Sequence, residues 1–106
     1  MIARPMKLQW FQILLALSEQ DLHGYGIQRE VLKNTGGHMR LWPAMLYRSL
    51  NTLEQAGLIK QIPAPSGNAG DERRQYYTLT PTGWARLRDE AEYMEGWIRT
   101  VRSARP

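Results

Sequence analysis

The segment from Pro43 to Gly57 constrains the fold most tightly, because a helix there is followed at once by a hairpin. "PAMLYRSLNTLEQAG" carries proline in its first turn and glycine at its end, which is typical of a complete helix. "LIKQI" and "RQYYTL" are short β-prone runs, and the loop "PAPSGNAGDE" between them is rich in turn residues.

Two further helical segments precede this helix, and one follows the hairpin. "MKLQWFQILLALSE", from Met6 to Glu19, is apolar on most of its circumference, so we expect it to be buried on more than one side. "DLHGYGIQREVLKNTGG" contains a polar turn, a shorter helix and a Gly36-Gly37 stop. Thr80-Pro81 is a typical N-cap and first-turn pair for a last helix that runs to about Val101.

The predicted order of elements is therefore helix, helix, helix, strand, loop, strand and long helix. This order predicts a mainly α-helical protein with a small β-hairpin. Residues 1–80 would form a winged helix-turn-helix DNA-binding domain and residues 81–106 a C-terminal dimerisation helix, together one structural unit. A length of 106 residues fits a single domain.

Several classes of protein are excluded by composition. There is no cysteine, which excludes disulfides and thiolate metal sites. The longest apolar run, Ile13 to Leu17, is too short to cross a bilayer, and no secretion signal opens the chain. We therefore expect a cytoplasmic protein without membrane association.

The residues that support catalysis or metal binding are scarce. Neither histidine has a set of metal ligands near it, so we expect His23 to have a local cap or turn role and His38 to lie in a solvated loop. We expect the acids of the last helix to form a mostly solvated face: Asp89, Glu90, Glu92 and Glu95. The sequence thus predicts no metal, no cofactor and no enzymatic activity.

The helix from Pro43 has one face suited to a DNA groove. Successive residues advance by 100°, so its core stripe consists of Leu46, Leu50, Leu53 and Gly57. The opposite, outward face consists of Ala44, Arg48, Asn51 and Gln55. Arginine can bridge guanine acceptors and an amide can bridge adenine, and a net charge of +4 favours an anionic partner. An ordinary solvated surface would look similar, but the preceding short helix and the following hairpin favour DNA.

Two flanking positions on this helix complete the predicted contact set. Met45 lies to one side of the outward face and Tyr47 to the other. Tyr47 could donate its hydroxyl to a phosphate or could pack against the first helix, and the sequence leaves both open. The predicted DNA contacts are Met45, Tyr47, Arg48, Asn51, Arg73 and Arg74.

The last helix carries a hydrophobic seam with spacings of 3, 4, 3, 4 and 3 residues. The seam consists of Trp84, Leu87, Ala91, Met94, Ile98 and Val101, with Trp97 beside it. Such a seam needs a partner, either a second copy of the chain or the chain's own first helix. We expect both, because Trp10 and its neighbours add more apolar surface than one small domain covers. The predicted dimer interface is Trp10 with the seam and Trp97.

"GDERRQYYTLT", from Gly70 to Thr80, closes the hairpin and leads into the last helix. Alternation along the strand predicts that Leu79 and one tyrosine, Tyr77, point into the core. Arg73 and Arg74 follow the turn-rich loop and would contact DNA at short range, and the sequence does not decide between them.

Three motifs in this order resemble the PadR-like transcriptional regulators. They are "LHGYGI", "LYRSLNTLEQAGLI" and "DERRQYYTLTPTG", and the resemblance covers nearly the whole chain. The single short C-terminal helix is similar to the smaller subfamily. The resemblance implies a homodimeric winged-helix DNA-binding protein, usually a repressor, which a small-molecule effector can release. Trp42 and Met45 depart from the small capping residue and the hydroxyl residue that are frequent at these positions.

Three hypotheses follow for the function. The first is a dimeric regulator, most simply a repressor, bound to a near-palindromic site in double-stranded DNA. The second is a winged-helix module that binds protein. The third is a ligand sensor, in which Trp84 and Trp97 form a slot for a small aromatic or cationic effector at the dimer interface.

Overall fold

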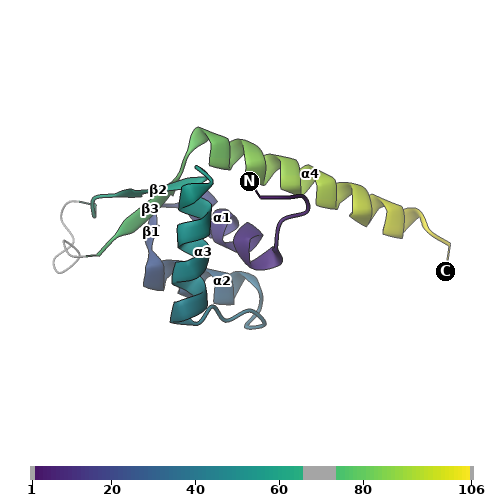
Figure 1. Cartoon of the computed structure of the whole chain (residues 1–106). Helices are drawn as coiled ribbons and strands as arrows, with labels where there is room; N and C mark the ends of the chain where they lie inside the picture. Colours follow the sequence, from purple (N-terminus) through teal and green to yellow (C-terminus); the bar gives the residue numbers. More distant parts are fainter. Residues whose placement is uncertain (1, 66–73, 106) are drawn as a thin grey trace.

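The computed structural model describes residues 2–65 and 74–105 and consists of four helices and a small sheet. The elements in chain order are α1 (Leu8–Glu19), β1 (Leu22–His23), α2 (Gly24–Asn34), α3 (Pro43–Gln55), β2 (Ile59–Ile62), β3 (Tyr76–Leu79) and α4 (Pro81–Ser103). The predicted fold class is confirmed: three helices, a hairpin of β2 and β3, and one long helix (Figure 1).

The core is built around α1. Its buried residues are Ile13, Leu14, Ala16 and Leu17, and they belong to one apolar cluster to which every other helix also contributes. The contribution of α3 consists of Leu46, Leu50 and Leu53, each no more than 2% exposed, as the helical period predicted. Gly57 lies beyond the end of α3 and is exposed, with a φ of +77° that ends the helix.

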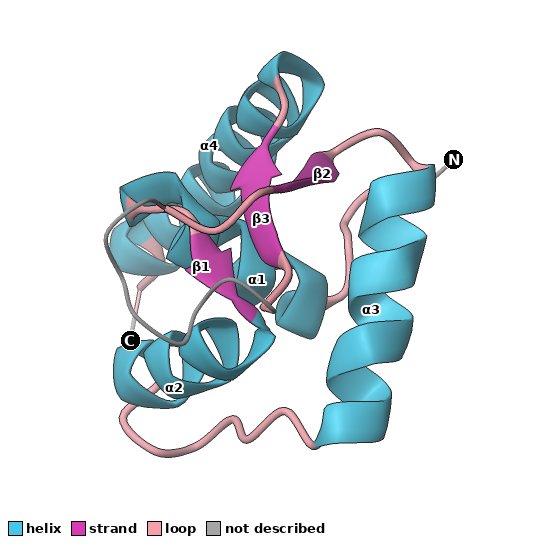
Figure 2. Cartoon of the chain, turned by 90° about the vertical axis from the view of Figure 1, so that its left-hand side faces the viewer, coloured by secondary structure: helices cyan, strands magenta, loops and turns pink. Residues whose placement is uncertain are grey.

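The sheet has three strands in the order β1-β3-β2, all antiparallel (Figure 2). The prediction of a two-stranded hairpin missed β1, which pairs Leu22 with Tyr77 and His23 with Tyr76. A two-residue strand contains no alternation that a sequence could show. Its presence also corrects the expectation of one buried tyrosine, because Tyr76 and Tyr77 are both buried. The rings of Tyr76 and His23 are in edge-to-face contact, and their centres are 5.2 Å apart.

The predicted caps of α2 and α4 are confirmed. His23 Nδ1 accepts a hydrogen bond from the Gly26 amide, and Thr80 Oγ1 accepts one from the Gly83 amide. Trp42 precedes α3 without any side-chain cap, as its departure from the family pattern indicated. His38 lies exposed in the connection between α2 and α3.

A corner between α3, the sheet and α4 is held by hydrogen bonds from Thr80 to the backbone just after α3. The Thr80 amide donates to the Leu58 carbonyl, and the Thr80 hydroxyl donates to the Gly57 carbonyl. Gly83 packs so closely that a Cβ atom there would lie 1.9 Å from the Leu58 oxygen. The first turn of α4 is therefore fastened to the chain just after α3 ends.

Residues 2–7, the N-terminal arm, run alongside α4 (Figure 1). Arg86 donates to the carbonyls of Ile2 and Ala3, and the Met6 amide donates to Glu90 Oε1 at 2.8 Å. The expectation of a solvated carboxylate is wrong for Glu90, which is 2% exposed. It lies on the face of α4 that the arm covers, where Arg86 Nε is 3.1 Å from its other oxygen.

Candidate DNA-binding surface

The outward face of α3 is exposed along its whole length. Ala44, Arg48, Asn51 and Gln55 are all solvent-exposed, opposite the leucines that anchor the helix. Figure 2 shows α3 standing at one side of the molecule, with the strands and α2 on its other side. Sequence reasoning named Arg48 and Asn51 as contacts but left out Gln55, although the same helical period places it on this face.

Tyr47 packs against Gly24 at the start of α2. A Cβ atom added at Gly24 would lie 2.6 Å from the Tyr47 hydroxyl, so the ring lies directly on the Gly24 backbone and would have to shift for a larger residue. Tyr47 is still 55% exposed. The structure therefore holds it at the surface, beside the N-terminus of α2, in a place from which its hydroxyl can reach a bound partner.

A cavity of about 410 Å³ lies on this side of α3, and we call it the wing-side cleft. Its lining residues are His23, Gly24, Tyr25, Tyr47, Arg74, Gln75 and Tyr77. Arg74 Nη1 lies 2.9 Å from Nε2 of His23, which ties this arginine to the start of α2. The surroundings of Arg74 are therefore basic and aromatic. Arg73, together with Gly70, Asp71 and Glu72, lies outside the described residues.

Burial raises the pKa of the Tyr77 phenol above its ordinary value, and Glu54 and Tyr47 act in the same direction. Tyr77 therefore stays a neutral hydrogen-bonding group at the base of the wing-side cleft. Gln61 on β2 donates to Glu54 at 3.2 Å, which links the hairpin to α3.

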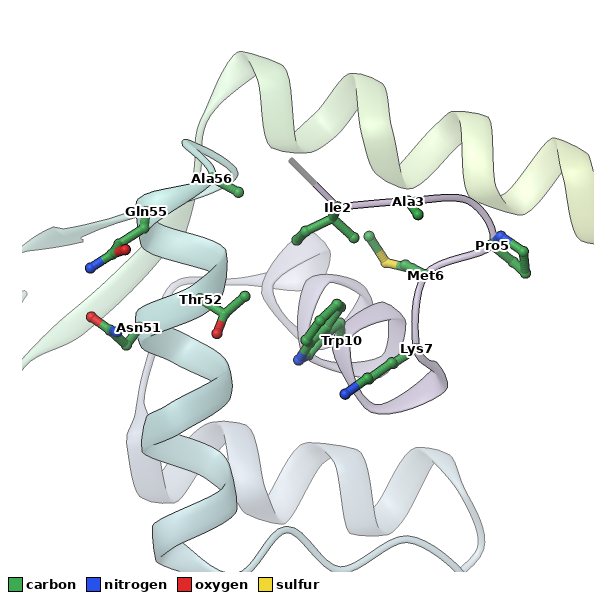
Figure 3. A pocket seen from close by; sticks show the side chains of 10 residues that line it. All are labelled: Ile2, Ala3, Pro5, Met6, Lys7, Trp10, Asn51, Thr52, Gln55 and Ala56. Atoms are coloured by element: carbon green, nitrogen blue, oxygen red, sulfur yellow. The ribbon is translucent and has the colours of Figure 1, made fainter.

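A second cavity, of about 600 Å³, lies on the opposite side of α3, and we call it the arm-side cleft (Figure 3). Its lining residues are Ile2, Ala3, Pro5, Met6, Lys7, Trp10, Asn51, Thr52, Gln55 and Ala56. Trp10, predicted at a dimer interface, is half-buried against the core and borders this cleft together with Thr52 of α3 (Figure 3). Met45 is also half-buried on this side, packed against the core.

The residues predicted for dimerisation divide along α4. Leu87 is 7% exposed and belongs to the subunit's own core, while Ala91 and Met94 are half-buried. Trp97, Ile98 and Val101 are 48%, 50% and 74% exposed and, with Arg102, line an apolar hollow of about 240 Å³. Trp84 is 36% exposed, with the Arg88 guanidinium 5.4 Å above its ring.

Within residues 2–65 and 74–105, no group of three or more histidine and acidic side chains is placed to hold a metal ion. Nor does any helix in this part of the chain combine the length and apolar character needed to cross a membrane.

The protein family follows from the sequence match. A model of the transcriptional regulator PadR-like family matches residues 13–89, from the middle of α1 to the first half of α4. The chain belongs to the PadR-like family of transcriptional regulators. The family resemblance inferred from the three motifs is thus confirmed, as is the expectation that the chain is a regulator rather than an enzyme.

Solved structures of PadR-like and related regulators share the fold. A PadR family regulator from Clostridium difficile R20291 is 25% identical with a TM-score of 0.74, over 90% of this chain and 94% of that chain. A transcriptional regulator from Clostridium thermocellum is 26% identical with a TM-score of 0.73, over 89% and 86%. Bacillus subtilis PadR in complex with operator DNA is 25% identical with a TM-score of 0.65, over 78% and 46%.

One curated protein is also similar in sequence. An uncharacterized 37.1 kDa protein in transposon TN4556 of Streptomyces fradiae is 38% identical over 82 residues, or 77% of this chain. The chain spans only 21% of that relative's length, so the likeness concerns one part of a longer protein.

Proposed function

We propose that this PadR-like regulator is a homodimer that binds double-stranded DNA and places α3 in the major groove. The observation that carries the proposal is the exposed row of Arg48, Asn51 and Gln55 opposite a fully buried leucine stripe. Side chains of this type read guanine and adenine edges. The structural likeness to Bacillus subtilis PadR, which was solved with operator DNA, supports the same use of the fold here.

The second part of the proposal is pairing of two copies through the distal half of α4, residues 91–103. Trp97, Ile98 and Val101 leave an apolar surface uncovered, and a second copy related by a twofold axis would cover it. Such a pair would present two α3 helices about 34 Å apart to successive major grooves of a near-palindromic site. In this arrangement residues 1–80 carry the DNA-binding surface, and the C-terminal helix within residues 81–106 pairs the subunits through its distal half.

The third part concerns regulation. We assign the protein the role of a cytoplasmic repressor, because a dimer seated on an operator blocks access to the DNA and the family resemblance implies this sign. A small aromatic or cationic effector would find an apolar hollow beside Trp97. Tryptophan emission that stays unchanged during titration with phenols and aromatic amines would argue against this effector site.

The test of DNA reading is a pair of arginine variants. Arg48→Ala should lower the preference for the selected site over random DNA by about 1–3 kcal/mol, because it removes a base contact. Arg74→Ala should weaken binding to both DNAs by a similar factor and reduce the salt dependence, because it removes a phosphate contact. The site would first be selected from random DNA, and affinities would be measured at several salt concentrations.

Equal losses for Arg48→Ala on selected and random DNA would contradict the base-reading role of Arg48. A wild-type protein without salt-dependent DNA affinity would contradict the proposal as a whole and favour a module that binds protein. A monomeric mass in solution would leave DNA binding in place but remove the twofold arrangement.

A further inference from the structure

We propose that the arm-side cleft receives a phosphate of the DNA backbone, on the side of α3 opposite the hairpin, with Lys7 as its cation. The inference rests on the proposed DNA binding and extends it to a contact from the start of α1. It makes the DNA-binding surface two-sided, with α3 between the hairpin and the N-terminal arm (Figure 1).

The position of the cleft on α3 is the first argument. Tyr47 borders the wing-side cleft and Thr52 the arm-side cleft, and five helical residues separate their directions by about 140°. The outward face lies between them. A helix with its side chains is about 10–12 Å across, close to the width of the major groove, so a phosphate backbone must pass along each flank of an inserted helix.

The chemistry of the cleft is the second argument. Lys7 is exposed, and its Nζ lies 5.0 Å from the centre of the Trp10 ring. Within the described part of the chain Lys7 forms no ion pair, and no carboxylate is among the described residues that line the cleft. Its ammonium group is therefore available to an anion, while the half-buried indole limits where it can move.

The continuity of the cleft with α3 favours DNA over a small anion. Asn51 and Gln55 line the cleft and also belong to the outward face, so the space opens toward the surface that would meet the groove. An anion seated beside Lys7 would thus lie next to bound DNA. A phosphate of the DNA backbone on this flank can therefore be the anion that Lys7 binds, and no separate ligand is needed.

The main experiment compares DNA affinities of Lys7→Ala and wild-type protein between 50 and 200 mM salt. One lost phosphate contact makes the slope of log K against log salt shallower by about 0.9. Between 50 and 200 mM salt, the affinity of the wild-type protein should therefore fall about three- to fourfold more, per subunit, than the affinity of Lys7→Ala. The loss should be alike on selected and random DNA. Lys7→Arg should restore the slope, because it restores the charge.

Arg99→Ala is the matched control. Arg99 is exposed and belongs to the distal half of α4, the part of the helix that extends away from α3 (Figure 1), and its removal lowers net charge by the same amount. The control should leave the slope nearly unchanged. If Lys7→Ala and Arg99→Ala behave alike, the effect is one of net charge and the proposed contact is wrong.

Single methylphosphonate substitutions along the selected site locate the contact, because each removes one phosphate charge. In wild-type protein, one substitution at the groove edge opposite the hairpin should weaken binding, and in Lys7→Ala the same substitution should have no further effect. Additive losses at every position would overturn the inference. If Arg48→Ala still loses base preference, such a result would leave the proposed function intact.

Discussion

The two halves of α4 share one helical pattern but have different surroundings. The proximal half, residues 81–90, is enclosed by the corner at Leu58 and by the N-terminal arm, and its buried residues are Gly83, Leu87 and Glu90. The distal half, residues 91–103, projects beyond the core, which lengthens the molecule to 55 Å against 28 and 25 Å in the other directions (Figure 1). The spacing of apolar residues along α4 thus predicts which side chains share one face of the helix, but not which part of the structure or which partner buries that face.

This difference predicts that substitutions in the proximal half damage the subunit itself. Substitutions of the exposed apolar residues in the distal half should weaken pairing of the subunits and leave the folding of each subunit nearly unchanged. Three experiments with matched controls test the contrast, beginning with the largest expected effect on folding.

Gly83→Ala should be the most damaging change. The added Cβ would lie 1.9 Å from the Leu58 oxygen and 2.9 Å from its carbonyl carbon, and backbone atoms cannot rotate away. We expect a loss of at least about 4 kcal/mol in the free energy of unfolding, enough to unfold much of a small domain. Circular dichroism during thermal and urea denaturation would measure it.

Gly96→Ala is the control for Gly83→Ala on the same helix. A Cβ atom there meets nothing within 4 Å, so the better helix propensity of alanine should stabilise the subunit by about 0.5–1 kcal/mol. If both substitutions had the same small effect, Gly83 would not be packed closely against the Leu58 carbonyl.

Glu90→Gln should have the next largest effect. It keeps the shape of the side chain and an oxygen that can accept the Met6 amide, but it removes the negative charge that pairs with Arg86. Removing one partner of a buried pair costs about 3 kcal/mol, because the other charge stays poorly solvated. Urea denaturation of the purified variant would show the loss as a lower midpoint.

Asp89→Asn provides the comparison from the neighbouring residue. Asp89 pairs with Arg4 at 2.8 Å, but both side chains are about half exposed, at 51% and 54%. An exposed pair contributes about 0–1 kcal/mol, so this variant should stay close to wild type. Equal losses for the two variants would show that the arm does not shield Glu90 from solvent.

Ile98→Asp should leave the folding of the isolated subunit nearly unchanged, because this side chain is 50% exposed within it. It should weaken dimerisation by about a hundredfold or more, because pairing would bury a carboxylate without a partner. Sedimentation at several protein concentrations would measure the dissociation constant. Thr100→Asp introduces the same charge on another face of α4 and should have little effect; dimers that survive Ile98→Asp would exclude this interface.

Much of the fold was predictable because its signals are local in the chain. The caps at His23 and Thr80, the glycine after α3 and the leucine stripe each follow from residues within one or two helical turns. The arm and β1 were not predictable, because their partners are far away in sequence. The Met6 amide donates a hydrogen bond to Glu90, which is 84 residues away in the sequence, and no periodic pattern predicts such a contact.

The DNA-binding surface was predictable to a similar extent. Helical period alone placed Arg48 and Asn51 outward, while the packing of Tyr47 on Gly24 depends on how α2 crosses α3. Lys7 was not predicted as a contact. It lies one residue before α1, and its proposed role depends on the position of α3 in the fold. The net charge of +4 favours contacts between basic side chains and an anion, but it does not show which side chains make them.

The corner at Leu58 has a mechanical consequence for operator choice. It joins α4 to the chain within a few residues of α3, through Thr80, Gly57 and Gly83. A helix of 23 residues is about 35 Å long, so a rotation of about 5° at its fastened end displaces the far end by about 3 Å. In the proposed dimer, that lever converts a small change of angle at the corner into a different distance between the two reading helices. The spacing of half-sites could therefore drift during evolution through substitutions that touch neither DNA nor the partner subunit.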